Sequence, residues 1–63
     1  MDKKTLIARL RQLETIDKNA FTIYTDLSEL AQDSEQKEIF SDIANDEKRH
    51  VALSKEMLSL LEE

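Results

Sequence analysis

The sequence predicts an all-α protein, in which two antiparallel helices form a hairpin and two hairpins associate into a four-helix bundle. The chain has 63 residues and contains no glycine and no proline, so strands and tight turns have little of the chemistry that builds them. Its apolar residues recur at spacings of four and three, which is typical of packed helices. This periodicity stops and restarts once, at the segment AQDSEQ.

The first helix is predicted over about residues 3–31. Heptad spacing places its regularly spaced residues on one stripe, where they can pack against a partner helix. This stripe consists of Leu6, Leu10, Leu13, Asp17, Ala20, Tyr24, Leu27 and Ala31. A flanking stripe consists of Ile16, Ile23 and Leu30.

The second helix is predicted over about residues 35–61, after a turn at residues 32–34. Asp33 followed by Gln36 resembles a capping box, and Ser34 is an alternative cap. The stripe of this helix consists of Gln36, Phe40, Ile43, Glu47, His50, Ser54, Met57 and Leu61. Its flanking stripe consists of Ala44, Val51 and Leu58.

The short connection between the helices favours an antiparallel hairpin. With their flanking stripes, both helices have apolar faces wider than one partner helix covers. A chain of this length also buries only part of its apolar surface by itself. We therefore expect the hairpin to form a homodimer or a higher homo-oligomer.

Three ionisable residues interrupt the two apolar stripes: Asp17, Glu47 and His50. Pairing Asp17 with the midpoint of Glu47 and His50 puts the centre of the hairpin within the predicted turn, so we expect the three side chains at one level. Buried carboxylates without a partner are costly, and two at one level predict a cation between them.

Small side chains flank this polar layer, because Ala20 and Ser54 each lie about one helical turn away from it. They leave room for an ion and a small substrate. A two-fold dimer doubles the layer to four carboxylates and two imidazoles, whose negative charge two divalent cations balance. Oxygen-rich sites with one nitrogen per metal suit iron or manganese better than zinc.

Composition excludes several classes of function. The chain has no cysteine, which rules out disulfides and thiolate sites. Its formal charge of −5 argues against nucleic acid as a partner. No apolar run approaches the ~18 residues that a membrane span needs, and the opening MDKKTLIARLRQ lacks the features of a signal peptide. We therefore expect no membrane association and a cytoplasmic location.

Two segments resemble a known family. The run IDKNAFTIY is similar to the first-helix signature of rubrerythrin-type ferritin-like proteins, with Asp17, Ala20 and Tyr24 at the characteristic spacing. The run FSDIANDEKRHVALSKEML is similar to the second-helix signature, whose Glu-x-x-His motif falls on Glu47 and His50. The chain corresponds to half of the usual four-helix domain, and in this it is most like the encapsulated ferritins.

The resemblance implies a function. In such proteins a single hairpin dimerises to complete a di-iron ferroxidase centre, with two irons per dimer and oxygen or peroxide as oxidant. Glu47 is then a bridging ligand and His50 a terminal one. The resemblance also names an encapsulating protein shell as a further partner, and the interior of such a nanocompartment as an alternative location.

Some assignments stay open at the level of sequence. The family usually has glutamate where this chain has Asp17, so Glu14, one turn earlier, is an alternative or additional ligand. Tyr24 is expected to be a packed aromatic residue, the alternative being a hydroxyl beside the metal ligands. Manganese is the alternative metal. A non-catalytic oligomerisation module, in which the polar layer fixes helix register, is the alternative function.

Overall fold

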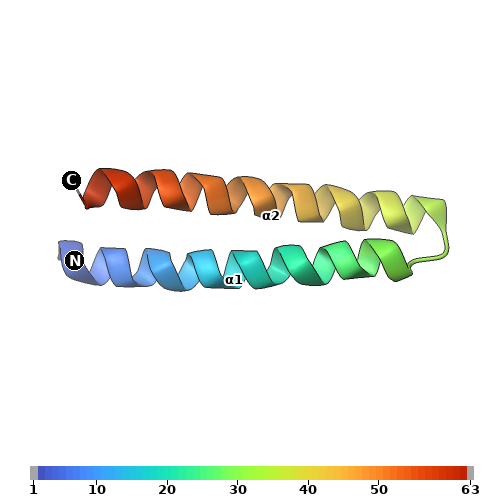
Figure 1. Cartoon of the computed structure of the whole chain (residues 1–63), viewed down its shortest axis with the longest axis horizontal. Coiled ribbons are helices and arrows are strands. Elements are labelled where there is room, and N and C mark those ends of the chain that lie inside the picture. The colour runs from blue at the N-terminus through green and yellow to red at the C-terminus, as the bar shows by residue number, and fades with distance from the viewer. Residues whose placement is uncertain (1, 63) are drawn as a thin grey trace.

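The computed structural model describes residues 2–62 and consists of two antiparallel helices, α1 (Lys3–Leu30) and α2 (Ser34–Leu61). The helices lie side by side along their whole length, and the start of α1 is next to the end of α2 (Figure 1). The hairpin measures 46 × 14 × 14 Å. The prediction of an all-α hairpin is therefore confirmed, and the observed helix bounds differ from the predicted ones by one residue at each side of the turn.

Aspartate side chains cap the start of both helices. The Asp2 carboxylate accepts a hydrogen bond from the Thr5 backbone N–H at 2.7 Å. Asp33 accepts hydrogen bonds from the backbone N–H groups of Glu35 at 2.7 Å and Gln36 at 3.2 Å. Asp33 is thus the cap and Ser34 is the first residue of α2. Such caps satisfy N–H groups that have no partner within the helix.

Burial identifies the residues that α1 and α2 place between them, since in a single hairpin a helix is covered only by the other helix. The buried and half-buried residues include one heptad series in each helix. In α1 this series is Ile7, Leu10, Glu14, Asp17, Phe21, Tyr24 and Ser28. In α2 it is Phe40, Ala44, Glu47, Val51, Ser54, Leu58 and Leu61. We call these two series the hairpin interface.

The predicted stripes are partly wrong. Every second residue of each predicted stripe belongs to the hairpin interface. The other stripe residues include five that are exposed: Leu6, Leu13, Gln36, His50 and Met57. The flanking stripe of α2, in contrast, belongs to the interface. The physical reason is that two heptad frames offset by four residues share half of their positions, and four residues correspond to a net rotation of only about 40° around the helix.

The exposed large apolar side chains lie together on one side of the hairpin. In each helix they occupy the two heptad positions next to the interface on one side. Antiparallel helices are related by a two-fold rotation about an axis normal to their common plane, so this side is the same for both helices. We call this set the apolar face: Leu6, Leu13, Ile16, Ile23, Leu30, Ile39, Leu53, Met57 and Leu60. A helix of the length and apolarity needed to cross a membrane is not found among residues 2–62.

The α1 stripe that borders the hairpin interface on this side is more hydrophobic than its counterpart within the interface. The exposed or half-exposed stripe contains Leu6, Leu13, Ala20 and Leu27. The corresponding interface positions are Ile7, Glu14, Phe21 and Ser28. Exposed apolar patches of this extent are typical of interaction surfaces. The single hairpin therefore leaves a strongly apolar surface exposed.

Candidate metal centre

Asp17, Glu47 and His50 lie together in the middle of the hairpin. One potential ligand atom from each residue lies within 4.8 Å of the others. Asp17 projects from α1, while Glu47 and His50 come from successive turns of α2. This arrangement agrees with the expectation that the three residues share one level. In an antiparallel hairpin, the number of residues between a position and the turn sets the position along the hairpin axis.

Glu47 is the electrostatically strained member of the cluster. Its side chain is only 19% exposed, and its Oε2 atom is buried without a hydrogen-bond partner among the described residues. Burial raises the pKa of Glu47, the neighbouring Asp17 carboxylate raises it further, and His50 partly opposes the shift. Loss of water and the approach of a like charge both disfavour the ionised carboxylate. A cation at this point offsets both effects.

His50 lies at the border between the hairpin interface and the apolar face. Its Nδ1 is 3.9 Å from Oε1 of Glu47, and its side chain is 49% exposed. Asp17, in contrast, is only 8% exposed. The cluster is thus covered on the side of the interface and accessible on the side of the apolar face.

The donor set fits a divalent cation of intermediate hardness. Two carboxylates supply oxygen atoms and one imidazole supplies nitrogen, a combination suited to iron or manganese. The unpartnered Oε2 of Glu47 supports this fit, because buried polar atoms in native proteins are normally paired. The three residues of one chain leave coordination positions for further ligands.

An open hollow of about 320 Å³ adjoins the cluster. It is lined by Leu13, Asp17, His50, Leu53 and Ser54. The two leucines belong to the apolar face and were not identified as site residues from the sequence. The sequence signal is their spacing: Leu13 lies four residues before Asp17, and Leu53 lies three residues after His50. These spacings place each leucine on the same side of its helix as the neighbouring site residue.

Glu14, the alternative ligand, is directed elsewhere. Its carboxylate forms an ion pair with Lys18 Nζ at 2.8 Å. This hydrogen bond lowers the pKa of Glu14, as do the charges of Lys18, Lys55 and Arg11. Glu14 lies within the hairpin interface, yet the structure groups only Asp17 with the two α2 residues.

Tyr24 packs against an aromatic residue of α2. The centroids of the Tyr24 and Phe40 rings are 6.3 Å apart, with an interplanar angle of 33°. This tilted arrangement is a favourable aromatic contact. Tyr24 lies two turns from Asp17, and its contact with Phe40 is the one expected of a packed aromatic residue.

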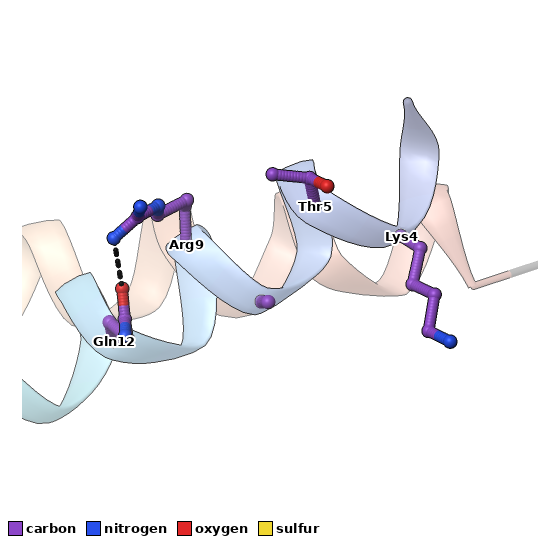
Figure 2. A pocket seen from close by; sticks show the side chains of 5 residues that line it. Lys4, Thr5, Arg9 and Gln12 are labelled. Atoms are coloured by element: carbon purple, nitrogen blue, oxygen red, sulfur yellow. Dashed lines mark hydrogen bonds between the residues drawn. The ribbon is translucent and has the colours of Figure 1, made fainter. Parts of the chain in front are cut away.

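A second hollow, of about 400 Å³, lies on the outer surface near the start of α1. It is lined by Lys4, Thr5, Ala8, Arg9 and Gln12, all from α1. Arg9 turns towards Gln12 and donates a hydrogen bond to its Oε1 at 3.1 Å, while Lys4 extends in another direction (Figure 2). The two cations do not converge on a common point, so we assign no binding function to this hollow.

Substituting Glu47 by glutamine is expected to stabilise the metal-free protein at pH 7. The raised pKa of Glu47 means that the folded state holds the proton more tightly than the unfolded state does. The stability that this proton contributes is present below the ordinary pKa of 4.5 and is lost as the pH rises through the raised value. Glutamine stays neutral throughout.

Thermal unfolding of wild-type and Glu47→Gln protein, measured by circular dichroism between pH 4 and pH 8 at equal concentration with chelator, checks this expectation. The unfolding temperature of the variant is higher at pH 7, and the difference closes as the pH falls. Asp2 and Glu14, whose pKa values are lowered, are present in both proteins and cancel in the comparison. A difference independent of pH contradicts the proposed burial of charge.

Comparison of the chain with protein-family models, with curated proteins and with solved structures gives no match.

Proposed function

We propose that this protein is a di-metal carboxylate protein of the ferritin-like superfamily, a rubrerythrin-type half-domain most like the encapsulated ferritins. Two copies of the hairpin share a di-iron centre, and the centre is a ferroxidase that oxidises iron(II) with oxygen or peroxide. The observation that carries the proposal is the convergence of Asp17, Glu47 and His50 around a buried, unpartnered carboxylate oxygen.

The location of the cluster supports a site shared by two chains. Asp17 and Glu47 belong to the hairpin interface, and His50 opens onto the apolar face. A second hairpin that covers the apolar face brings its own cluster towards the first. The pair of chains then provides four carboxylates and two imidazoles, enough to neutralise two divalent cations and to supply them with oxygen and nitrogen ligands.

The residues of the chain have distinct roles in this proposal. Glu47, the most deeply shielded carboxylate of α2, is the bridging ligand between two ions. Asp17 and His50 are terminal ligands, one from each helix, so that metal binding also ties α1 to α2. Leu13 and Leu53 keep water from the accessible side once the second hairpin is in place. Two bound iron(II) ions supply one electron each, which together match the two-electron reduction of dioxygen to peroxide.

Anaerobic titration with iron(II) tests the proposal. We expect two ions per dimer, one per chain, followed by rapid oxidation when oxygen or hydrogen peroxide is mixed in a stopped-flow absorbance experiment. Manganese(II) is expected to compete for the same sites. Protein that takes up neither metal in stoichiometric amount contradicts the proposal.

Assembly provides an independent measurement. A metal that binds only the assembled site shifts association by mass action. Sedimentation is measured on two samples, one with iron(II) under anaerobic conditions and one with chelator. The sample with iron should contain the larger dimer fraction. An equal dimer fraction under both conditions contradicts a site at the interface between chains.

The second candidate function is a non-catalytic oligomerisation module. It is favoured by the position of Asp17 and Glu47 within the hairpin interface, because buried polar residues can fix the register of packed helices. The module assembles without metal. The same titration and sedimentation measurements therefore separate the two functions, since assembly with no metal uptake supports the module.

A further inference from the structure

A third hollow, which we call the cationic hollow, is lined by residues of both helices on the side away from the apolar face. Its volume is about 250 Å³. The lining consists of Lys18, Phe21, Thr22, Lys48 and Val51. Ile16 of the apolar face directly precedes an interface residue, whereas Lys18 and Lys48 directly follow one. One residue corresponds to a rotation of about 100°, so the lysines and the apolar face lie on opposite sides of the hairpin interface.

Cations face each other across this side of the hairpin. Lys18 and Lys48 each directly follow a carboxylate of the candidate metal centre, so the two lysines share its level. Arg11 and Lys55 lie seven residues away from them, further from the turn in each helix, and form a second facing pair. Positions beside a helix–helix interface usually carry opposite charges, because like charges there repel. An anion between the cations relieves this repulsion.

Carboxylates of the chain neutralise only part of this positive charge. Lys18 forms an ion pair with Glu14 at 2.8 Å, and Arg11 forms one with Glu62. Lys48, in contrast, forms no ion pair within residues 2–62. The cationic hollow therefore keeps an excess of positive charge, although the formal charge of the whole chain is −5.

The lining of the cationic hollow combines ammonium groups with apolar surface. Phe21 and Val51 are half-buried residues of the hairpin interface and supply the apolar part. The Thr22 hydroxyl already donates to the carbonyl oxygen of Lys18 at 3.2 Å. An ammonium group has three N–H donors, so Lys18 can bind an anion while it keeps its pair with Glu14. A volume of about 250 Å³ exceeds the ~30 Å³ of one water molecule and leaves room for an organic molecule.

We propose that the cationic hollow binds a small organic phosphate, with the phosphate group at Lys18 and Lys48 and the organic part on Phe21 and Val51. A phosphate monoester carries about −1.5 to −2 charges at pH 7, which matches two ammonium groups, and lysine commonly binds phosphate as a point charge. The proposal goes beyond the proposed function and does not depend on it. A second hairpin on the apolar face leaves this opposite side accessible.

Titration with phenyl phosphate tests the proposal on metal-free protein in a phosphate-free buffer of low ionic strength. Backbone amide resonances are followed by NMR, and we expect those of Lys18, Phe21, Lys48 and Val51 to shift. Inorganic phosphate lacks the apolar part and phenol lacks the charge, so each is expected to bind at least about fivefold more weakly. Absence of shifts with phenyl phosphate overturns the site. Equal affinity for inorganic phosphate or for phenol overturns the assigned ligand class.

The Lys48→Gln variant tests the role of the ammonium group without breaking an ion pair of the hairpin. We expect the Kd for phenyl phosphate to rise about fivefold, the upper range for an exposed ion pair. Lys4→Gln is the matched control, because it removes the same charge from the same side of α1, about 21 Å from Lys18. Circular dichroism checks that both variants are folded.

Two outcomes of the variant experiment overturn the assignment. One is a wild-type Kd in Lys48→Gln, and the other is an equal loss in Lys4→Gln, which indicates a general effect of net charge. Because phenyl phosphate binding is measured without metal, its failure is distinct from a failure of iron uptake, which contradicts only the proposed function.

Discussion

Replacing Glu47 or His50 by alanine is expected to abolish stoichiometric iron binding. Changes to residues that merely support a metal ligand typically cost 10- to 100-fold in affinity, so removal of a ligand itself should cost at least about a hundredfold. The loss is largest for Glu47, because this residue serves both ions of the proposed centre. Metal content after anaerobic loading and desalting, measured by mass spectrometry, reports the effect directly.

Two further variants serve as controls. Glu56→Gln removes an exposed carboxylate from the same helix and keeps full iron binding. Glu14→Gln tests the alternative ligand, and its ion pair with Lys18 predicts that it binds iron as the wild type does. Iron binding that survives in both Glu47→Ala and His50→Ala contradicts the ligand assignment. If iron binding is lost in Glu14→Gln but retained in Asp17→Asn, the α1 ligand is Glu14.

Introducing a charge into the apolar face is expected to dissociate the proposed dimer into single chains. Ile23 is 57% exposed in the hairpin, and Ile23→Glu places a carboxylate where the proposed partner packs. Burial of an isoleucine side chain is worth about 1.5–3 kcal/mol, and a two-fold interface loses this contribution twice. The loss of about 3–6 kcal/mol corresponds to a dissociation constant at least a hundred times larger.

Sedimentation equilibrium measures this change, with the single-chain mass of 7.3 kDa as the lower limit. Thr22→Glu is the matched control, because it adds the same charge one residue away on a side of α1 outside the apolar face. Iron binding should fall together with the dimer in Ile23→Glu and persist in Thr22→Glu. A dimeric Ile23→Glu protein contradicts association through the apolar face.

Position along the hairpin could be predicted from the sequence alone. Asp33 begins α2 by accepting hydrogen bonds from two backbone N–H groups, which fixes the turn within narrow bounds. Once the turn is known, the distance of Asp17 from it equals the distance of Glu47 and His50 within one helical turn. The proximity of these three side chains could therefore be predicted from the rise per residue of two straight helices alone.

Rotation about each helix axis could not be predicted in the same way. Leu10, Asp17 and Tyr24 fit two heptad frames, and these frames differ in whether Leu13 or Glu14 joins them. Counting apolar residues favours the frame with Leu13, but the hairpin uses the frame with Glu14 and pairs its carboxylate with Lys18. The most hydrophobic frame of α1 therefore does not form the hairpin interface.

The sequence by itself determined the two helices, their antiparallel order and the common level of Asp17, Glu47 and His50. The causes are local: aspartate caps, the absence of glycine and proline, and a fixed rise per residue. Only the tertiary structure decided that Oε2 of Glu47 is buried without a hydrogen-bond partner among residues 2–62, while His50 remains half exposed beside a hollow. Those properties depend on which side of α2 meets α1. The packing between the helices sets the rotation of α2 about its own axis and so decides which side this is.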